Sequence, residues 1–351
     1  MRWILFLLLL PWAFSIGQAQ TAKRADLPEY VFIPPSAEKY DWKRVALVRG
    51  RTLFANEIAC SDSVVYSFGG FNTLRAQHEM NRLGGNRLIQ DTLSYPGSGF
   101  MDNIFFIRDS LMFIGGGCDS GMCRYAYQDF WQYNLNSHEW RRLHDLPFYY
   151  LRSPTVFKDR DHIRVLIARL RGEQLREALP VFYEYDVQAD RWKIISDDLP
   201  LTGFLTRYNL NSASFWLSLS AFNIGEYIYV LCQSSCNFQD DCANTLLRFN
   251  PQNGEWKALH PFPGGTQQML LAAFAFSDGV YGYVGGGFGH HAGNSKDVYR
   301  YDPEMDKWEQ IASLPLGVHW AKSWTYRGEH YVGFGISDKD LTVAVWKLQR
   351  K

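Results

Sequence analysis

Residues 301–315 read Tyr301-Asp-Pro-Glu-Met-Asp-Lys-Trp308-Glu-Gln-Ile-Ala-Ser-Leu-Pro315, and this stretch decides the fold because related copies of it recur along the chain. Each copy runs from an aromatic residue through a polar turn to a tryptophan seven residues later, and these tryptophans are Trp140, Trp192, Trp256 and Trp308. They lie 52, 64 and 52 residues apart, and Trp42 precedes Trp140 by 98 residues, which is two periods of 49. Because Asn, Asp, Pro and Gly favour chain reversal, each copy predicts two strands joined by a turn. The spacing indicates a structural repeat of about fifty residues.

A second phrase alternates with the first: a polar turn leads into a short apolar strand that ends in small residues. The clearest copies are residues 62–70, 109–117 and 278–287, which end in two or three consecutive glycines. Weaker copies occupy residues 161–167, 225–231 and 327–335, so the phrase occurs six times. Glycine suits places where strands crowd together, since it has no side chain and tolerates unusual backbone angles.

These features resemble the kelch repeat, which has a period of about fifty residues. The Tyr-Asp pair followed by a tryptophan matches in full at Tyr301-Asp302 and at Tyr185-Asp186, whereas Tyr133-Asn134 and Phe249-Asn250 carry Asn in place of Asp. The resemblance covers roughly residues 40–349. It implies an all-β fold, the kelch β-propeller, in which each repeat forms a four-stranded blade around a central channel.

The two ends of the repeat region predict how the ring closes. The last unit ends with a strand at residues 341–348, before any fourth strand, while residues 40–45 near the start look like an unpaired fourth strand. We therefore expect a six-bladed propeller in which the N-terminal strand completes the last blade, because this pairing removes two exposed sheet edges. The expected organisation is a signal peptide at 1–19, an N-terminal lead-in at 20–39 and the propeller at 40–351.

The first nineteen residues have the plan of a secretory signal peptide. A positive end at Arg2 is followed by an apolar run of 14 residues from Trp3 to Ile16, and then by Gly17-Gln18-Ala19. The alternative, a membrane anchor, is disfavoured because a spanning helix needs about 20 residues. We expect cleavage after Ala19, no membrane span, and a protein exported to the periplasm or the outside of the cell.

Composition limits the classes of function. The chain has 351 residues, is 46% hydrophobic, and balances 36 basic against 36 acidic residues. It is apolar enough to fold, and it lacks the basic excess of a nucleic-acid binder. No nucleotide-binding loop, nucleophile elbow or zinc-protease motif is present, so we expect no cofactor. We also expect the protein to be a monomer.

The six cysteines are interpreted through the predicted export. An oxidising compartment favours disulfides over metal thiolates, and no paired CxxC knuckles point to zinc. Cys60 stands alone in an apolar context. The candidates for local disulfides are Cys118, Cys123, Cys232, Cys236 and Cys242. Six cysteines allow 15 pairings, among which the sequence does not choose.

Candidate ligand-binding residues are taken from two sets of predicted loops, those after the glycines and those that lead into each innermost strand. They are Arg75, His78, Arg152, Arg171, Glu173, His290, His319 and Trp320. Arginine grips carboxylates with two hydrogen bonds, histidine exchanges protons near neutral pH, and Trp320 offers a flat ring for stacking. The alternative is that these are solvated loop residues, with Trp320 in the core. His290-His291 has no third ligand nearby, so no metal site is predicted.

Three functions remain open at this point. The first is an exported binding module for a protein or a glycan on one loop face, since the fold alone implies no chemistry. The second is a carbohydrate-active enzyme, because the chain is similar in signal, repeat and blade number to exported bacterial sialic-acid mutarotases, with Arg152, Arg171, Glu173, His78 and His319 as possible acid–base or carboxylate-binding groups. The third is a copper radical oxidase like galactose oxidase, which is disfavoured because those enzymes have seven blades and added domains.

Overall fold

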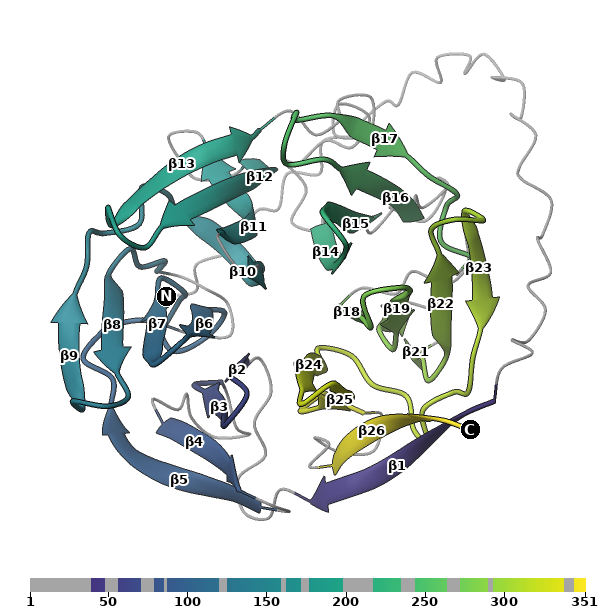
Figure 1. Cartoon of the computed structure of the whole chain (residues 1–351), viewed down its shortest axis with the longest axis horizontal. Coiled ribbons are helices and arrows are strands. Elements are labelled where there is room, and N and C mark those ends of the chain that lie inside the picture. Colours follow the sequence, from purple (N-terminus) through teal and green to yellow (C-terminus); the bar gives the residue numbers. More distant parts are fainter. Residues whose placement is uncertain are drawn as a thin grey trace, which may run out of the picture. The chain divides into compact units, whose positions relative to one another are not determined.

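The structure, a computed structural model, describes residues 39–47, 56–70, 79–84, 87–119, 125–158, 162–171, 177–197, 217–234, 244–263, 272–289, 293–337 and 344–351. Within these residues the strands form six four-stranded antiparallel sheets, which Figure 1 shows as blades arranged in a ring. The six-bladed, all-β fold predicted from the repeats is confirmed. No helix suited to spanning a membrane occurs in the described part of the chain.

The first three blades follow one another along the chain, each written from its innermost strand outward. Blade 1 contains β2 (Glu57–Cys60), β3 (Val65–Phe68), β4 (Glu79–Gly84) and β5 (Arg87–Ser94). Blade 2 contains β6 (Ile104–Arg108), β7 (Leu111–Gly115), β8 (Phe130–Asn134) and β9 (Glu139–Arg142). Blade 3 contains β10 (Tyr150–Lys158), β11 (Ile163–Arg171), β12 (Glu177–Asp186) and β13 (Arg191–Ser196).

The remaining blades complete the circle. Blade 4 contains β14 (Leu217–Ile224), β15 (Tyr227–Ser234), β16 (Asn244–Phe249) and β17 (Trp256–Ala258). Blade 5 contains β18 (Phe274–Ser277), β19 (Gly282–Gly285), β22 (Val298–Asp302) and β23 (Lys307–Gln310), with a small extra hairpin of β20 (Phe288–Gly289) and β21 (Gly293–Asn294). Blade 6 contains β24 (Lys322–Tyr326), β25 (Glu329–Gly333), β26 (Ala344–Arg350) and β1 (Tyr40–Leu47). Each innermost strand contacts the innermost strands of its two neighbours, and the cycle closes between β24 and β2.

The N-terminal strand closes the ring, as predicted. β1 pairs antiparallel with β26, with Tyr40 opposite Arg350 and Trp42 opposite Leu348. Trp42 is buried, and its Nε1 donates a 2.8 Å hydrogen bond to the carbonyl of Ala312 in the linker that leaves blade 5. The first strand of the described residues therefore holds two blades at once.

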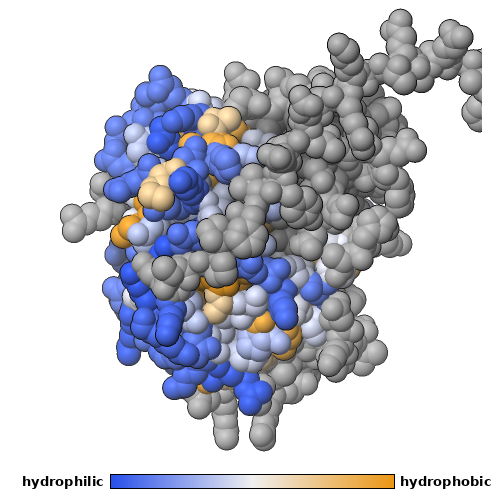
Figure 2. Space-filling model, turned by 90° about the vertical axis from the view of Figure 1, so that its right-hand side faces the viewer, coloured by the Kyte–Doolittle hydropathy of each residue, from blue (hydrophilic) through white to orange (hydrophobic). Residues whose placement is uncertain are grey.

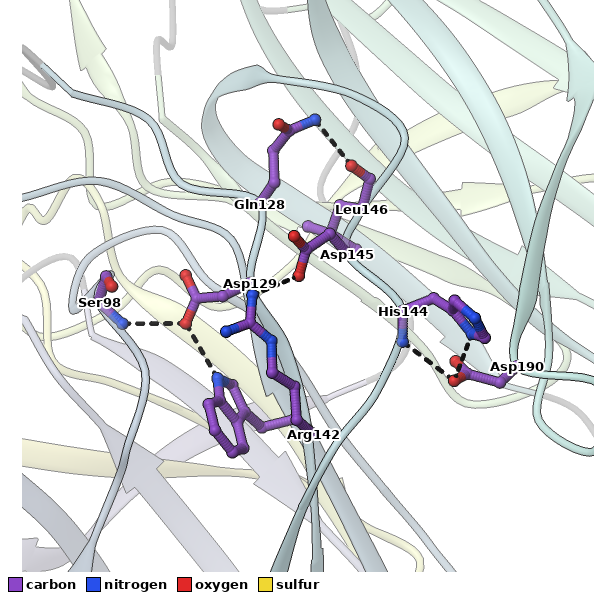
Figure 3. A network of polar contacts seen from close by, with 9 residues as sticks. Ser98, Gln128, Asp129, Arg142, His144, Asp145, Leu146 and Asp190 are labelled. Atoms are coloured by element: carbon purple, nitrogen blue, oxygen red, sulfur yellow. Dashed lines mark hydrogen bonds and ion pairs between the residues drawn. The ribbon is translucent and has the colours of Figure 1, made fainter.

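The repeated Tyr-turn-Trp phrase explains how neighbouring blades are joined. The turn residue five positions after the tyrosine takes a left-handed backbone, with φ of 51° at Asp190 and 50° at Asp306. Asp190 accepts a 2.7 Å hydrogen bond from the Tyr185 hydroxyl and a 3.0 Å bond from the backbone N–H of His144 in the preceding blade. Figure 3 shows this contact between blades. Asp306 accepts the same two kinds of hydrogen bond, from the Tyr301 hydroxyl and from the backbone N–H of His260. In blades 3 and 5 the repeat therefore holds the segment that leaves the blade before it.

The cores lie between the blades and are rich in aromatic rings. Phe113, Phe130, Tyr185 and Trp192 form one such cluster between blades 2 and 3. The described residues on the side that faces the viewer in Figure 2 are largely hydrophilic, with small separate hydrophobic spots. The repeat tryptophans thus serve packing, as their fixed position in the phrase predicts.

Candidate functional site

Two kinds of loop meet on one face of the propeller. In an antiparallel blade the second strand ends where the first begins, so the loop after the second strand and the linker into the first strand share one face. We call this the loop face, and the opposite side, with tight turns such as residues 278–280 and 303–306, the turn face. The residues after the repeat glycines and before the innermost strands therefore lie around the centre of the ring of blades on this face (Figure 1), and we call this central part of the loop face the channel mouth.

A cluster of rings and polar groups lies on the loop face at blades 5 and 6; it consists of Phe288, Asn294, His319 and Trp320, and we call it the His319–Trp320 cluster. Nδ1 of His319 lies 2.6 Å from Oδ1 of Asn294, on the small hairpin that follows β19. The His319 ring centre is 5.0 Å from that of Trp320 and 5.5 Å from that of Phe288. All four side chains are partly exposed. The imidazole of His319 and the amide of Asn294 therefore form one hydrogen-bonded unit on this face.

The backbone holds this cluster firmly. His319 exchanges two backbone hydrogen bonds with Ile336, of 3.0 and 2.8 Å, and the Trp320 N–H donates to the carbonyl of Ala272 at 3.0 Å. Trp320 takes a left-handed backbone with φ of 53°, and Asp102 and Ala272 do the same at the corresponding position of other blades. A bulky residue rarely adopts this conformation on its own. Since two other blades adopt it at the same position, we attribute the left-handed turn to the repeat and not to Trp320 itself. In blade 6 the residue at this turn carries a large aromatic ring on the loop face.

An ion pair lies next to this mouth, between the innermost strands of blades 1 and 6. Oε1 of Glu57 on β2 and Nζ of Lys322 on β24 are 2.7 Å apart, and their side chains are only 11% and 17% exposed. Burial raises the pKa of Glu57 to about 7; the charge of Lys322 opposes this rise and the charge of Asp102 adds to it. Glu57 is therefore a carboxyl group that exchanges a proton near neutral pH.

This pKa predicts a pH dependence of stability. Between the ordinary value of 4.5 and about 7, the folded chain keeps a proton on Glu57 that the unfolded chain has released. The free energy of unfolding should therefore fall as the pH rises through this window, by about 3 kcal/mol. In urea unfolding at about pH 5 and about pH 8, Glu57→Gln should lose less stability than the wild type over the same interval. The same pH dependence in both proteins would contradict the assignment to Glu57.

The structure brings together only some of the sequence-predicted site residues. His319 and Trp320 lie side by side in the segment that leads into β24, and Asn294 joins them from the loop after the glycines of blade 5. The placement of Arg152 and Arg171 in loops was wrong: Arg152 lies within β10 and Arg171 ends β11, because the β11–β12 pairing continues as far as Arg171 opposite Glu177. The remaining candidates, Arg75, His78, Glu173 and His290, lie outside the described residues.

The cysteines also need one correction. Cys232 is a free thiol rather than a disulfide partner. It lies on β15 in an apolar cluster with Leu247 and Phe249, and burial raises its pKa to about 12. Cys118 is buried, whereas Cys123, Cys236 and Cys242 lie outside the described residues, so the pairings proposed for these residues stay predictions.

Sequence reasoning missed several residues on this side of the molecule. The Glu57–Lys322 pair joins residues 265 positions apart, and no sequence signal links them. Tyr125 is 66% exposed and Tyr149 is 38% exposed on the loop face of blades 2 and 3. The doublet Tyr149-Tyr150 where β10 begins could have indicated an exposed ring, because neighbouring residues of a strand point to opposite sides and one of the two must face away from the core.

Residues 283–315, which include the stretch quoted first, match the family model of the kelch motif. No curated protein matches the chain.

Proposed function

The chain is a six-bladed kelch-repeat β-propeller, and from this premise we propose that it is a binding module that holds a carbohydrate on its loop face. The observation that carries the proposal is the His319–Trp320 cluster, in which partly exposed rings surround an imidazole–amide hydrogen bond. A protein ligand is the alternative for the same face.

The chemistry of the cluster suits a sugar ring. A pyranose has an apolar face of C–H groups and a rim of hydroxyls, each of which donates and accepts hydrogen bonds. An aromatic ring packs against the C–H face of the sugar. Amide and imidazole groups form hydrogen bonds with its hydroxyls. A few placed polar groups beside apolar rings are typical of small-ligand sites. The fixed backbone of the cluster reduces the entropy lost on binding.

Replacing Trp320 tests this function. Trp320→Ala should weaken binding of a glycan found on an array by about tenfold, because loss of ring stacking costs about 1.4 kcal/mol. Trp320→Phe should restore part of the affinity. Tyr227→Ala is the matched control, since Tyr227 is an aromatic residue that is 36% exposed beside the turn face. Titration calorimetry measures the affinity of all three variants and of the mature wild-type chain. Unchanged affinity in Trp320→Ala, or capture of a protein with no glycan bound, would defeat the carbohydrate assignment.

A second candidate, a sugar mutarotase or epimerase of the sialic-acid type, is favoured by one observation. Glu57, at the loop-face end of β2, has a pKa of about 7 and suits proton exchange at neutral pH. NMR of freshly dissolved sialic acid would decide: the mature protein should speed the interconversion of the anomers if this function holds, and an unchanged rate eliminates it.

We also infer that the protein is exported to the periplasm or the outside of the cell and acts as a monomer. The support for export is the apolar segment and small-residue cleavage pattern of residues 1–19. Sequencing of the secreted chain should give Gln20 as the first residue, and an intact Met1 would argue against export by this route.

A further inference from the structure

A second group of aromatic side chains lies on the loop face, in the part of the ring opposite the His319–Trp320 cluster. It consists of Tyr125, Tyr127 and Tyr149, and we call it the tyrosine group. Tyr125 is 66% and Tyr149 38% exposed, and Tyr127 is partly exposed. Exposed rings on the face already proposed to bind sugar are candidates for further contacts, because aromatic side chains supply large contact area at low entropic cost.

The two groups lie in equivalent loops of blades 2 and 5, although at different positions within those loops. Tyr125 and Tyr127 follow the second strand of blade 2, as Phe288 and Asn294 follow that of blade 5. Matching backbone bonds confirm the equivalence: the N–H of Leu146 donates to the carbonyl of Gln128, and that of Leu314 to the carbonyl of Lys296. Tyr149 and the pair His319-Trp320 then lie in the linkers that leave these two blades. Blades three apart in a ring of six face each other across the channel (Figure 1).

The tyrosine group stands on a fixed support. The Tyr127 N–H donates to the carbonyl of Gly117 at 2.9 Å, and the side chain of Gln128 donates to the carbonyl of Leu146 at 2.8 Å, as Figure 3 shows. Tyr150, next to Tyr149, is buried and makes three hydrogen bonds through its hydroxyl. Because these bonds fix the backbone from which the rings project, binding does not have to order the loop itself.

From this arrangement we propose that the ligand is a neutral oligosaccharide chain that crosses the channel mouth and contacts both the His319–Trp320 cluster and the tyrosine group. This inference rests on the proposed function. A single sugar unit covers one ring group only, whereas a chain of repeated units presents the same C–H faces and hydroxyls to both. Once one end of the sugar chain is bound to one ring group, its other end is held at a high effective concentration beside the second ring group. The affinity therefore rises although each contact is of the same kind. The rings of both groups carry no formal charge, and the carboxylate of Asp119 accepts a 3.3 Å hydrogen bond from the Tyr125 N–H. A negative charge beside the tyrosine group favours neutral sugar units over acidic ones.

The test is a length series. Cello-, malto- and chito-oligosaccharides from one unit upward are titrated into the mature wild-type protein and into Tyr149→Ala, Trp320→Ala and the control Tyr227→Ala. For the wild type and the control, affinity should rise by at least about tenfold once the chain is long enough to reach both groups. Tyr149→Ala should bind the shortest sugar as the wild type does and lose the gain with length. Trp320→Ala should weaken binding at every length.

The outcomes separate this inference from the proposed function. A flat length series in the wild type, or a Tyr149→Ala variant that keeps the full gain, overturns the chain-spanning ligand while sugar binding at Trp320 stands. Absence of binding for every sugar, or no effect of Trp320→Ala at any length, overturns both. Tyr125→Ala, at the more exposed ring, repeats the test should Tyr149→Ala fail to fold.

Discussion

A chain that begins at Val48, and so lacks β1, should lose cooperative unfolding and should aggregate at concentrations where the mature chain stays soluble. Removing β1 exposes the whole edge of β26, which in the native protein pairs from Tyr40–Arg350 to Leu47–Ala344, and unpaired edges template association. It also removes Tyr40 and Trp42 from the aromatic cluster between blades 5 and 6. The buried Arg300 then loses its 3.0 Å hydrogen bond to the Tyr40 hydroxyl.

The matched control is a chain that begins at Lys39, which retains all of β1 and should unfold like the mature protein. Urea unfolding followed by tryptophan fluorescence, with light scattering for aggregation, compares the two. A monomeric chain from Val48 with an unchanged midpoint would contradict the role of β1 in closing the ring.

Removing one oxygen atom by Tyr150→Phe should lower the free energy of unfolding by about 3 kcal/mol or more. The Tyr150 hydroxyl accepts from the N–H groups of Ile104 and Gly117, at 3.1 and 2.9 Å, and donates to the carbonyl of Asp102 at 2.7 Å. All three partners are buried, and burial also raises the pKa of Tyr150, so the phenol stays protonated. The variant leaves three backbone groups without this partner, each at a cost of about 1–3 kcal/mol.

Tyr149→Phe is the control for this loss, since the neighbouring ring is exposed and its hydroxyl reaches water. It should change the free energy of unfolding by no more than about 0.5 kcal/mol. Equal stability of Tyr150→Phe and Tyr149→Phe would show that the hydroxyl does not join blades 2 and 3.

The fold could be predicted because each repeat carries its own packing and turn residues. The phrase from Tyr301 to Trp308 contains the ring that packs, the left-handed Asp306 and the tryptophan whose Nε1 donates to the carbonyl of His260 in the previous blade. These packing and turn residues recur with the period of the blades, so their spacing in the sequence predicts both the length of a blade and the number of blades. The closing strand could be predicted for a related reason, because a lone strand near the start matched a missing one near the end.

Strand lengths and disulfides were harder to predict. β11 extends through Arg171 because its partner β12 extends equally far, and nothing within either segment alone gives that register. Cys232 was expected in a bridge because cysteines cluster near it in sequence, yet alternation along β15 turns its side chain into the core.

The site was predicted in part. His319 and Trp320 were found from their chemistry and their place in the repeat, whereas Tyr125 and Tyr149 were not. In a chain that is 16% aromatic, most rings are core residues, and composition does not separate the few exposed ones. The Glu57–Lys322 pair depends on closure of the ring, which brings the first and last blades together, so only the folded structure shows it.

The most direct test of the central claim is a crystal structure of the mature protein soaked in a mixture of neutral oligosaccharides. The predicted result is a six-bladed ring with sugar density against Trp320 that continues across the channel mouth toward Tyr149. Density on the turn face alone, or a ring in which β1 does not pair with β26, would contradict it.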